Sequence, residues 1–316
     1  MTKYLIRRVV LLIPTLIGMS MLVFLMVRLL PGDIVDAMVG LDPQYTPEAK
    51  AVLRHQYGLD VSIPVQYVRW IADISRGNLG QSFRTREPIV TQLGRSFPVT
   101  LELALFSIFL SVIVAIPLGV VSAVRQNSGV DFLAHITGLI GLSVTNFWLA
   151  TLFLLFTSLA LHWVPSVIWI SPFKEPITNL SQMIMPALAL SVGLMAVEMR
   201  MARASMLEVL RQDYIRTARS KGLRESSVMF RHALKNAFIP VITVIGIQIG
   251  ALMGGSIIIE QIFGLPGVGW YMIQGVMTRD YPVIQVTTLF LAAIFVMMNL
   301  LVDLTYAYID PRIKYA

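Results

Sequence analysis

Six polar side chains lie in or near long apolar stretches, where polar groups are costly and often mark a transport path. They are Glu102, Asn146, Glu198, Gln248, Glu260 and Asp303. The four carboxylates lie near the ends of predicted spans, where snorkelling lowers the cost, so an interface or helix-pairing role is favoured for them. Asn146 and Gln248 lie deeper and could either bond across helices or face a hydrated passage. Asn146, Gln248 and Glu260 are the candidates that we retain for a translocation path.

Enzyme motifs are absent from the sequence. It contains no Gly-x-Ser-x-Gly, no His-Glu-x-x-His and no Gly-Lys pair, so there is no nucleophile elbow, zincin motif or phosphate-binding loop. Its four histidines are scattered, and it has no cysteine, which excludes disulfides, thiolate catalysis and Cys-based metal sites. We therefore assign no catalytic and no metal-binding residue. If nucleotide hydrolysis drives this protein, another chain performs it.

The composition predicts an all-α polytopic membrane protein. Hydrophobic residues make up 56% of the chain and charged residues 14%, against roughly 25% charged in soluble domains. A span needs about 20 apolar residues. Six stretches meet that length: 9–30, 98–124, 136–161, 183–202, 237–262 and 283–307. The first is longer than the apolar core of a signal peptide, so we interpret it as a retained helix.

Three regions follow from these spans. Residues 1–30 form a tail and the first transmembrane helix, residues 31–97 form a small extramembrane subdomain, and residues 98–316 form a core of five helices. Lys and Arg are concentrated in the short loops on one side, which predicts that both termini are cytoplasmic and the 31–97 subdomain is periplasmic. The net charge of +7 is explained by this topology and by anionic lipid, not by nucleic acid.

The longest cytoplasmic loop, 200–237, is strongly basic. Its Arg200–Asn236 stretch holds nine Lys/Arg against three acidic residues. Apolar residues recur there at helical spacing, from Met206 through Leu210 and Tyr214 to Ala218. Such a segment could be an amphipathic helix that lies on lipid. It could also be a structured platform on which a partner docks.

The order of residues in this loop is more specific than its charge. Asp213–Gly222, followed by His232-Ala233-Leu234-Lys235-Asn236 and Pro240, resembles the EAA loop of permease subunits of bacterial ABC importers, in the B type of the dipeptide/oligopeptide branch. Arg216-Thr217-Ala218 replaces Glu-Ala-Ala and Lys235 replaces proline, as is common in that branch. Further family-like segments include Leu30-Pro31-Gly32-Asp33, Gly77–Ser82, Thr100–Leu103, Arg279–Val283 and Asp310–Ile313. The resemblance therefore covers nearly the whole chain.

The resemblance implies a type I ABC importer permease fold in the bacterial inner membrane. The coupling helix would seat in a groove of a cytoplasmic ATPase subunit, through Asp213, Tyr214, Arg216, Thr217, Ala218, Lys221 and Gly222. ATP and Mg would be bound by two such ATP-binding subunits, so this chain would need no cofactor. A homologous second permease and a periplasmic or lipid-anchored substrate-binding protein would complete the transporter. The cargo would be a dipeptide or oligopeptide, or a related solute such as glutathione, a nickel chelate or an oligosaccharide.

Two glycine-rich features remain. Gly246, Gly250 and Gly254 share one helix face, which predicts close packing against another helix, either in this chain or in a partner permease. The segment Phe263–Trp270 contains helix-breaking Gly and Pro, which predicts a plain turn or a re-entrant, gate-lining loop, the latter slightly favoured. A secondary transporter would instead show inverted repeats, and none is evident.

Overall fold

The computed structural model describes residues 2–29, 35–36, 46–56 and 58–309, and these ranges are almost entirely helical. Outside helices, the described residues form turns and loops and one isolated antiparallel bridge, between Gln81 and Pro88. The predicted all-α class is confirmed. Parts of the predicted 31–97 subdomain, and the segments Leu30–Asp33 and Asp310–Ile313, lie outside the described residues in whole or in part.

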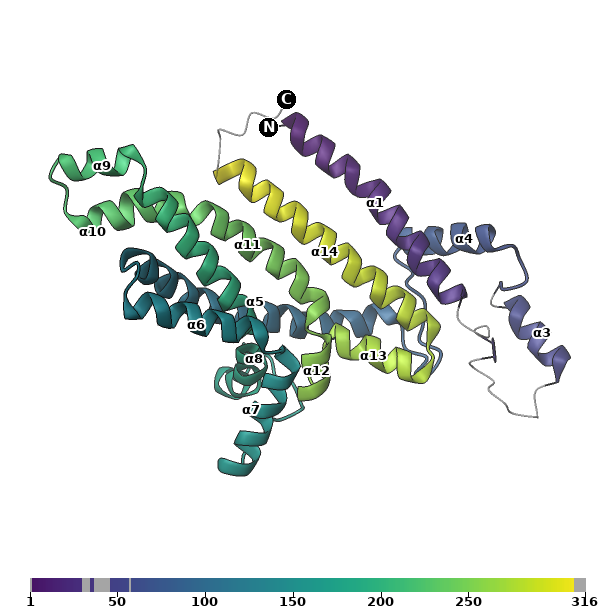
Figure 1. The fold of residues 1–316 in the computed structure, drawn as a ribbon. Helices are drawn as coiled ribbons and strands as arrows, with labels where there is room; N and C mark the ends of the chain where they lie inside the picture. The colour runs from purple at the N-terminus through teal and green to yellow at the C-terminus, as the bar shows by residue number, and fades with distance from the viewer. Residues whose placement is uncertain (1, 30–34, 37–45, 57, 310–316) are drawn as a thin grey trace.

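Within the described ranges, five helices are long and apolar enough to cross a membrane. They are α1 (Thr2–Arg28), α5 (Ile89–Val124), α8 (Pro176–Leu210), α11 (Leu234–Gly255) with the short elements before it, and α14 (Tyr281–Ile309). The beginning of α1, the end of α14 and the basic loop lie at the same end of this bundle (Figure 1). This arrangement agrees with the predicted placement of both termini on the side of the basic loop.

The third predicted span, 136–161, is not one straight helix. It is divided between α6 (Gly129–Ser143) and α7 (Asn146–Ala160), which meet at 96°. Val144 and Thr145 between them have extended backbones. The helix restarts at Asn146 after these two extended residues, without a capping hydrogen bond from the Thr145 side chain. The number of candidate spans is six if this bent pair counts as one.

Two other predicted boundaries are wrong. The second span begins at Ile89 rather than at residue 98, because the helix continues through Pro98. The fifth predicted span ends early, at Gly255, and is followed by α12 (Ile257–Phe263) and α13 (Val268–Thr278). Glycine and proline mark both places in the sequence, but packing decides whether the helix breaks there.

The core lies where α5, α7, α8 and α11 meet. Buried apolar residues such as Leu103 on α5, Met183 and Leu190 on α8 and Met253 on α11 form one cluster. Nearer the end of α5, small residues allow α5 and α8 to approach each other more closely. A Cβ on Gly119 of α5 would lie 2.7 Å from the Met199 carbonyl oxygen of α8. Helices in lipid gain stability mainly from such close packing, because the surrounding tails are equally apolar.

The outer elements lie at the opposite end of the bundle from the basic loop. Helix α1 packs along α14, and the short helices α3 (Pro47–Gln56) and α4 (Ile63–Ser75) lie near its end (Figure 1). Phe24 of α1 meets Tyr67 and Trp70 of α4 with ring centroids 5.4 and 5.7 Å apart. These aromatic contacts attach the amphipathic α4 to the end of the first span.

The glycine face of α11 packs inside this chain at two of its three positions. A Cβ on Gly246 would overlap the Val302 side chain of α14, and one on Gly250 would lie 3.3 Å from the Phe295 ring. Only Gly254 has no atom within 4 Å of the Cβ position. At Gly246 and Gly250 the close contact is therefore with α14 of this chain and not with a partner subunit. Contact between Gly254 and a helix of the partner permease stays a prediction.

We expect Gly246→Ala to destabilise the chain by about 1–3 kcal/mol, because overpacking forces neighbouring side chains or backbone to shift. The measurement is thermal unfolding of the purified protein in detergent. Gly254→Ala is the matched control on the same helix face and should be neutral or slightly stabilising, since alanine favours helix over glycine. Equal losses in the two variants would contradict the assigned contact.

Candidate coupling site

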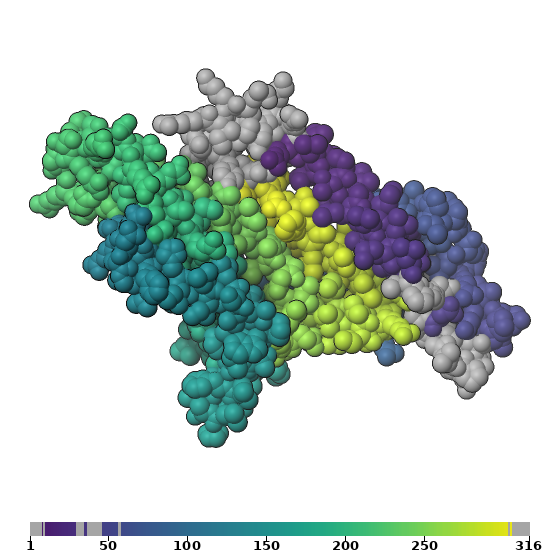
Figure 2. Space-filling view, viewed as in Figure 1, coloured from purple at the N-terminus to yellow at the C-terminus, as the bar shows by residue number. Residues whose placement is uncertain are grey.

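The basic loop folds into a short helix, α9 (Asp213–Ser220), which lies beyond the end of α8. Figure 2 shows the α9–α10 region projecting from the rest of the surface. Two side chains of α9 face inward: Ile215 is fully buried and Ala218 is 7% exposed. Since these two positions lie three residues apart, they define one apolar stripe on an otherwise polar helix.

This stripe seats α9 on the ends of the long helices. Ile215 and Ala218 belong to a buried cluster with Met206 of α8 and with Val228 and Ala233 of η1 (Val228–Ala233). The element η1 is a π-helical segment that leads directly into α11. Helix α9 is therefore joined to α8 and α11 by packed side chains and not by a loose linker.

Polar contacts brace the same helix. Arg219 donates to Glu225 of α10 (Glu225–Ser227) at 2.6 Å, and Asn236 donates to the Tyr214 hydroxyl at 2.9 Å. Between α9 and α10 the chain reverses at Gly222, whose φ is +72°. Residues other than glycine rarely adopt that conformation, with asparagine among the few that tolerate it, so glycine is favoured at this turn.

The predicted coupling residues divide into two roles. Ala218 is buried beneath the helix, and Gly222 shapes the turn that ends it. The remaining predicted residues are exposed and offer a mixed polar surface: Asp213, Tyr214, Arg216, Thr217 and Lys221. The structure thus brings all seven together on one projecting unit.

Two apolar residues near α9 were not predicted as part of this surface. Leu223 is 42% exposed and Phe230, on η1, is 69% exposed. Exposed large apolar side chains beside a polar rim are typical of protein contact sites. Periodicity does not identify Phe230, because the π-helical turn changes the angular position of the residues that follow it.

A buried ion pair lies beneath this region. Arg203 of α8 donates to both carboxylate oxygens of Asp131 of α6, at 2.8 and 2.9 Å. Ser122 of α5 and the Asn127 backbone N–H donate to the same carboxylate. The Asp131 side chain is only 5% exposed, so this network joins three helices at the level where the basic loop begins.

Two of the three candidate path residues meet at one place on α8. The Asn146 Oδ1 would lie 3.2 Å from a Cβ on Gly193, and Gln248 of α11 donates weakly to the Leu194 carbonyl at 3.4 Å. Both contacts connect neighbouring helices to the same turn of α8. The structure thus supports a helix-bonding role for Gln248 and close packing of Asn146 on α8, and a role in the path stays a prediction for both.

Glu260 is placed elsewhere, at the break between α12 and α13. It is fully buried and accepts hydrogen bonds from Thr100 at 2.8 Å, from Ser256 at 3.0 Å and from the Trp270 N–H at 2.9 Å. The Val268 N–H donates in turn to Thr100. These bonds attach the 263–270 turn to α5. Glu260 therefore joins helices in this conformation, and its role in the translocation path stays a prediction.

The expected interfacial position of the carboxylates is wrong for Glu198 and Glu260. Glu198 is fully buried on α8 and accepts from Ser111 of α5 at 3.0 Å. Glu102 fits the expectation better, because it is partly exposed and accepts from the Trp169 ring nitrogen at 3.0 Å. The Asp303 side chain lies outside the described residues. Helix pairing, the alternative role, agrees with the contacts of Glu198 and Glu260.

Comparisons with known proteins agree with this architecture. The family of binding-protein-dependent transport system inner membrane components matches residues 115–315, and its N-terminal companion family matches residues 1–104. The chain therefore belongs to the inner membrane component family of binding-protein-dependent transport systems, the permease subunits of ABC importers. It is therefore a multi-pass inner membrane protein, in a family whose members work with a second permease, ATPase subunits and a binding protein.

Full-length relatives and a solved structure narrow the resemblance. The chain is 41% identical to the dipeptide transport system permease protein of Alkalihalophilus pseudofirmus. It is 38% identical to the oligopeptide transport system permease protein of Bacillus subtilis. Both alignments cover the whole of this chain and the whole of the relative. An inward-facing structure of the MetNI methionine ABC transporter matches 71% of this chain and 99% of its own, with TM-score 0.56 and 19% identity. That likeness shows a shared fold.

Proposed function

We propose that this chain is one of two permease subunits of a peptide importer, and that α9 is the element through which ATP hydrolysis by partner subunits moves the permease. The observation that carries this proposal is the seating of α9: its buried stripe is packed on α8 and η1, while five polar residues project outward. A helix held in this way transmits motion in both directions. ATP and Mg bind to the partners, and this chain performs no catalysis.

Di- and oligopeptides are the proposed cargo, because the full-length relatives carry those names. A substrate-binding protein would deliver the peptide to the side opposite α9, where the short helices α3 and α4 lie. Alternating access would then carry it through the bundle. Uptake of a labelled dipeptide, a labelled pentapeptide and labelled glutathione, measured in parallel, tests this assignment. Transport of glutathione without transport of either peptide would reject it.

The docking of α9 can be tested by cysteine cross-linking, because the chain has no cysteine of its own. We expect Thr217→Cys, on the exposed side of α9, to form a disulfide with an ATP-binding subunit that carries one cysteine in its docking groove. Thr91→Cys, exposed near the start of α5 at the far end of the bundle, is the matched control and should not cross-link. Equal cross-linking from both positions would reject the docking assignment.

A further inference from the structure

A cavity of about 600 Å³ lies at the end of the bundle opposite α9. It is bounded by the end of α1, by α4, by the loop of residues 78–86 and by the start of α14. Its wall includes Phe24 and Trp70, whose rings pack together with centroids 5.7 Å apart. The coupling site and the candidate path residues use none of these side chains.

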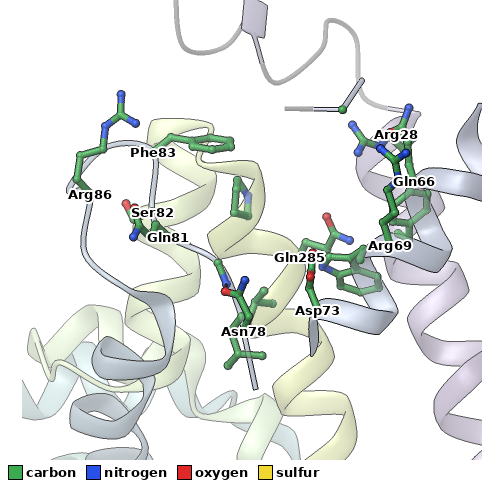
Figure 3. Close-up of a pocket in the computed structure, with 17 residues that line it drawn as sticks. Arg28, Gln66, Arg69, Asp73, Asn78, Gln81, Ser82, Phe83, Arg86 and Gln285 are labelled. Atoms are coloured by element: carbon green, nitrogen blue, oxygen red, sulfur yellow. Dashed lines mark hydrogen bonds between the residues drawn. The ribbon is translucent and has the colours of Figure 1, made fainter. Parts of the chain in front are cut away.

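Both signs of charge line this cavity. Figure 3 shows Arg28, Gln66 and Arg69 gathered on one side, with Gln285 and Asp73 beside them, while the Arg86 side chain points away. Arg69 and Asp73 stand four residues apart on α4 and so share a helix face. No salt bridge joins these two in the described part of the chain. They are therefore placed to receive the two charges of a zwitterion.

A buried amide also faces this space without a partner. Gln285 of α14 is 7% exposed, and its Nε2 has no hydrogen-bond partner among the described residues. Gln66, on the same wall, bonds through its Nε2 to Leu59 and Val61, but its Oε1 is likewise buried and unpartnered. Buried polar groups are normally satisfied, so this unpartnered donor is available to an acceptor that enters the cavity.

The depth of the cavity matches the lipid headgroups. Arg28 ends a 19-residue apolar span, Val10–Arg28, and about 20 residues cross the hydrocarbon core, so its guanidinium stands at the headgroup boundary. Met21 and Leu25 lie on the same helix face as Arg28 and are 47% and 39% exposed. An acyl chain can follow this exposed face away from the cavity. A soluble peptide would have no use for that apolar extension.

We propose that this cavity binds the headgroup of phosphatidylethanolamine from the leaflet opposite α9. The phosphate lies against the Arg28 and Arg69 guanidiniums and accepts from the Gln285 amide, and the lipid ammonium group lies toward the Asp73 carboxylate. Arginine suits phosphate because its planar fork donates two parallel hydrogen bonds. The bound lipid would fix α4 and the 78–86 loop to the end of α1.

Native mass spectrometry of the complete permease complex, purified in detergent with added phosphatidylethanolamine, tests the site. We expect Arg69→Glu to reduce the retained lipid about tenfold, as the loss of one strong contact does. Arg86→Glu makes the same charge change on the same cavity lining with a side chain that points away, and should leave retention unchanged. The unfolding temperature of the Arg69→Gln variant is measured as a control. An unchanged value would show that replacing Arg69 does not by itself misfold the protein. Equal retention in the Arg69 and Arg86 variants would overturn the proposal.

The chemistry of the headgroup is tested separately. Asp73→Asn should weaken retention of phosphatidylethanolamine. It should leave retention of phosphatidylglycerol unchanged, because that lipid has no ammonium group. Displacement of the bound lipid by inorganic phosphate would assign the site to a free anion instead. Displacement by a dipeptide would assign it to the transported substrate. Either displacement would overturn the lipid assignment.

Discussion

Replacing Gly222 with proline is expected to reduce transport by the assembled complex at least about tenfold, while the chain still inserts into the membrane. Gly222 has φ of +72°, whereas proline holds φ near −65°, so the turn after α9 cannot keep its shape. The Gly222 N–H bond to the Arg219 carbonyl, at 2.9 Å, is also lost. Helix α9 would then change its angle relative to the ATPase groove.

The measurement is peptide uptake by proteoliposomes that contain both permeases and the ATP-binding subunits, with ATP hydrolysis followed in parallel. We expect hydrolysis to continue without its usual stimulation by the loaded binding protein. Gly222→Asn is the matched control, because asparagine tolerates the left-handed conformation, and it should retain most of the uptake. Normal uptake by the proline variant would show that this turn plays no part in coupling.

The second large effect is expected at the buried ion pair. Arg203→Ala should destabilise the chain by about 3 kcal/mol, because it leaves a buried carboxylate without its charged partner. In this variant Asp131 keeps the Ser122 hydroxyl and the Asn127 N–H as donors. The expected loss of stability is therefore near the lower end of the usual range for a broken buried ion pair. The measurement is unfolding in detergent, followed by the loss of helical signal.

The exposed pair Arg219–Glu225 provides the comparison. Its side chains are 46% and 58% exposed, so Arg219→Ala should cost no more than about 1 kcal/mol. Both variants remove one arginine from an ion pair in the same half of the molecule. Similar losses of stability in the two would mean that burial of Asp131 does not set the strength of its pair.

Several predictions came close to the structure because they depend on local chemistry. Apolar runs of about 20 residues predict membrane helices directly, since the length of the run must match the hydrocarbon thickness. The helical spacing of apolar residues in the basic loop predicts an amphipathic helix, and the structure has one at Asp213–Ser220. Its buried stripe contains the predicted Ala218, but Ile215 takes the place of Tyr214, which is exposed. The register of Gly222 predicts the turn that follows it, because its left-handed backbone is a property of one residue.

Other features have no local signal. Arg203 and Asp131 are 72 positions apart, and nothing in either neighbourhood indicates that they meet. Glu198 and Glu260 look like interfacial residues by position, yet neighbouring helices bury both of them completely. The glycine face of α11 predicts a close contact, but its spacing cannot say whether α14 or another subunit supplies the partner.

The sequence by itself determined that this chain spans a membrane and carries a basic amphipathic loop, because hydrophobic length and Lys/Arg placement are written along the chain, and the order of its motifs placed it among the permeases. The tertiary structure alone decided the 96° bend between α6 and α7, the burial of Glu260 and the cavity at the end of α1. These depend on which helices pack together. That choice is made by the sum of many weak contacts between residues distant in the sequence.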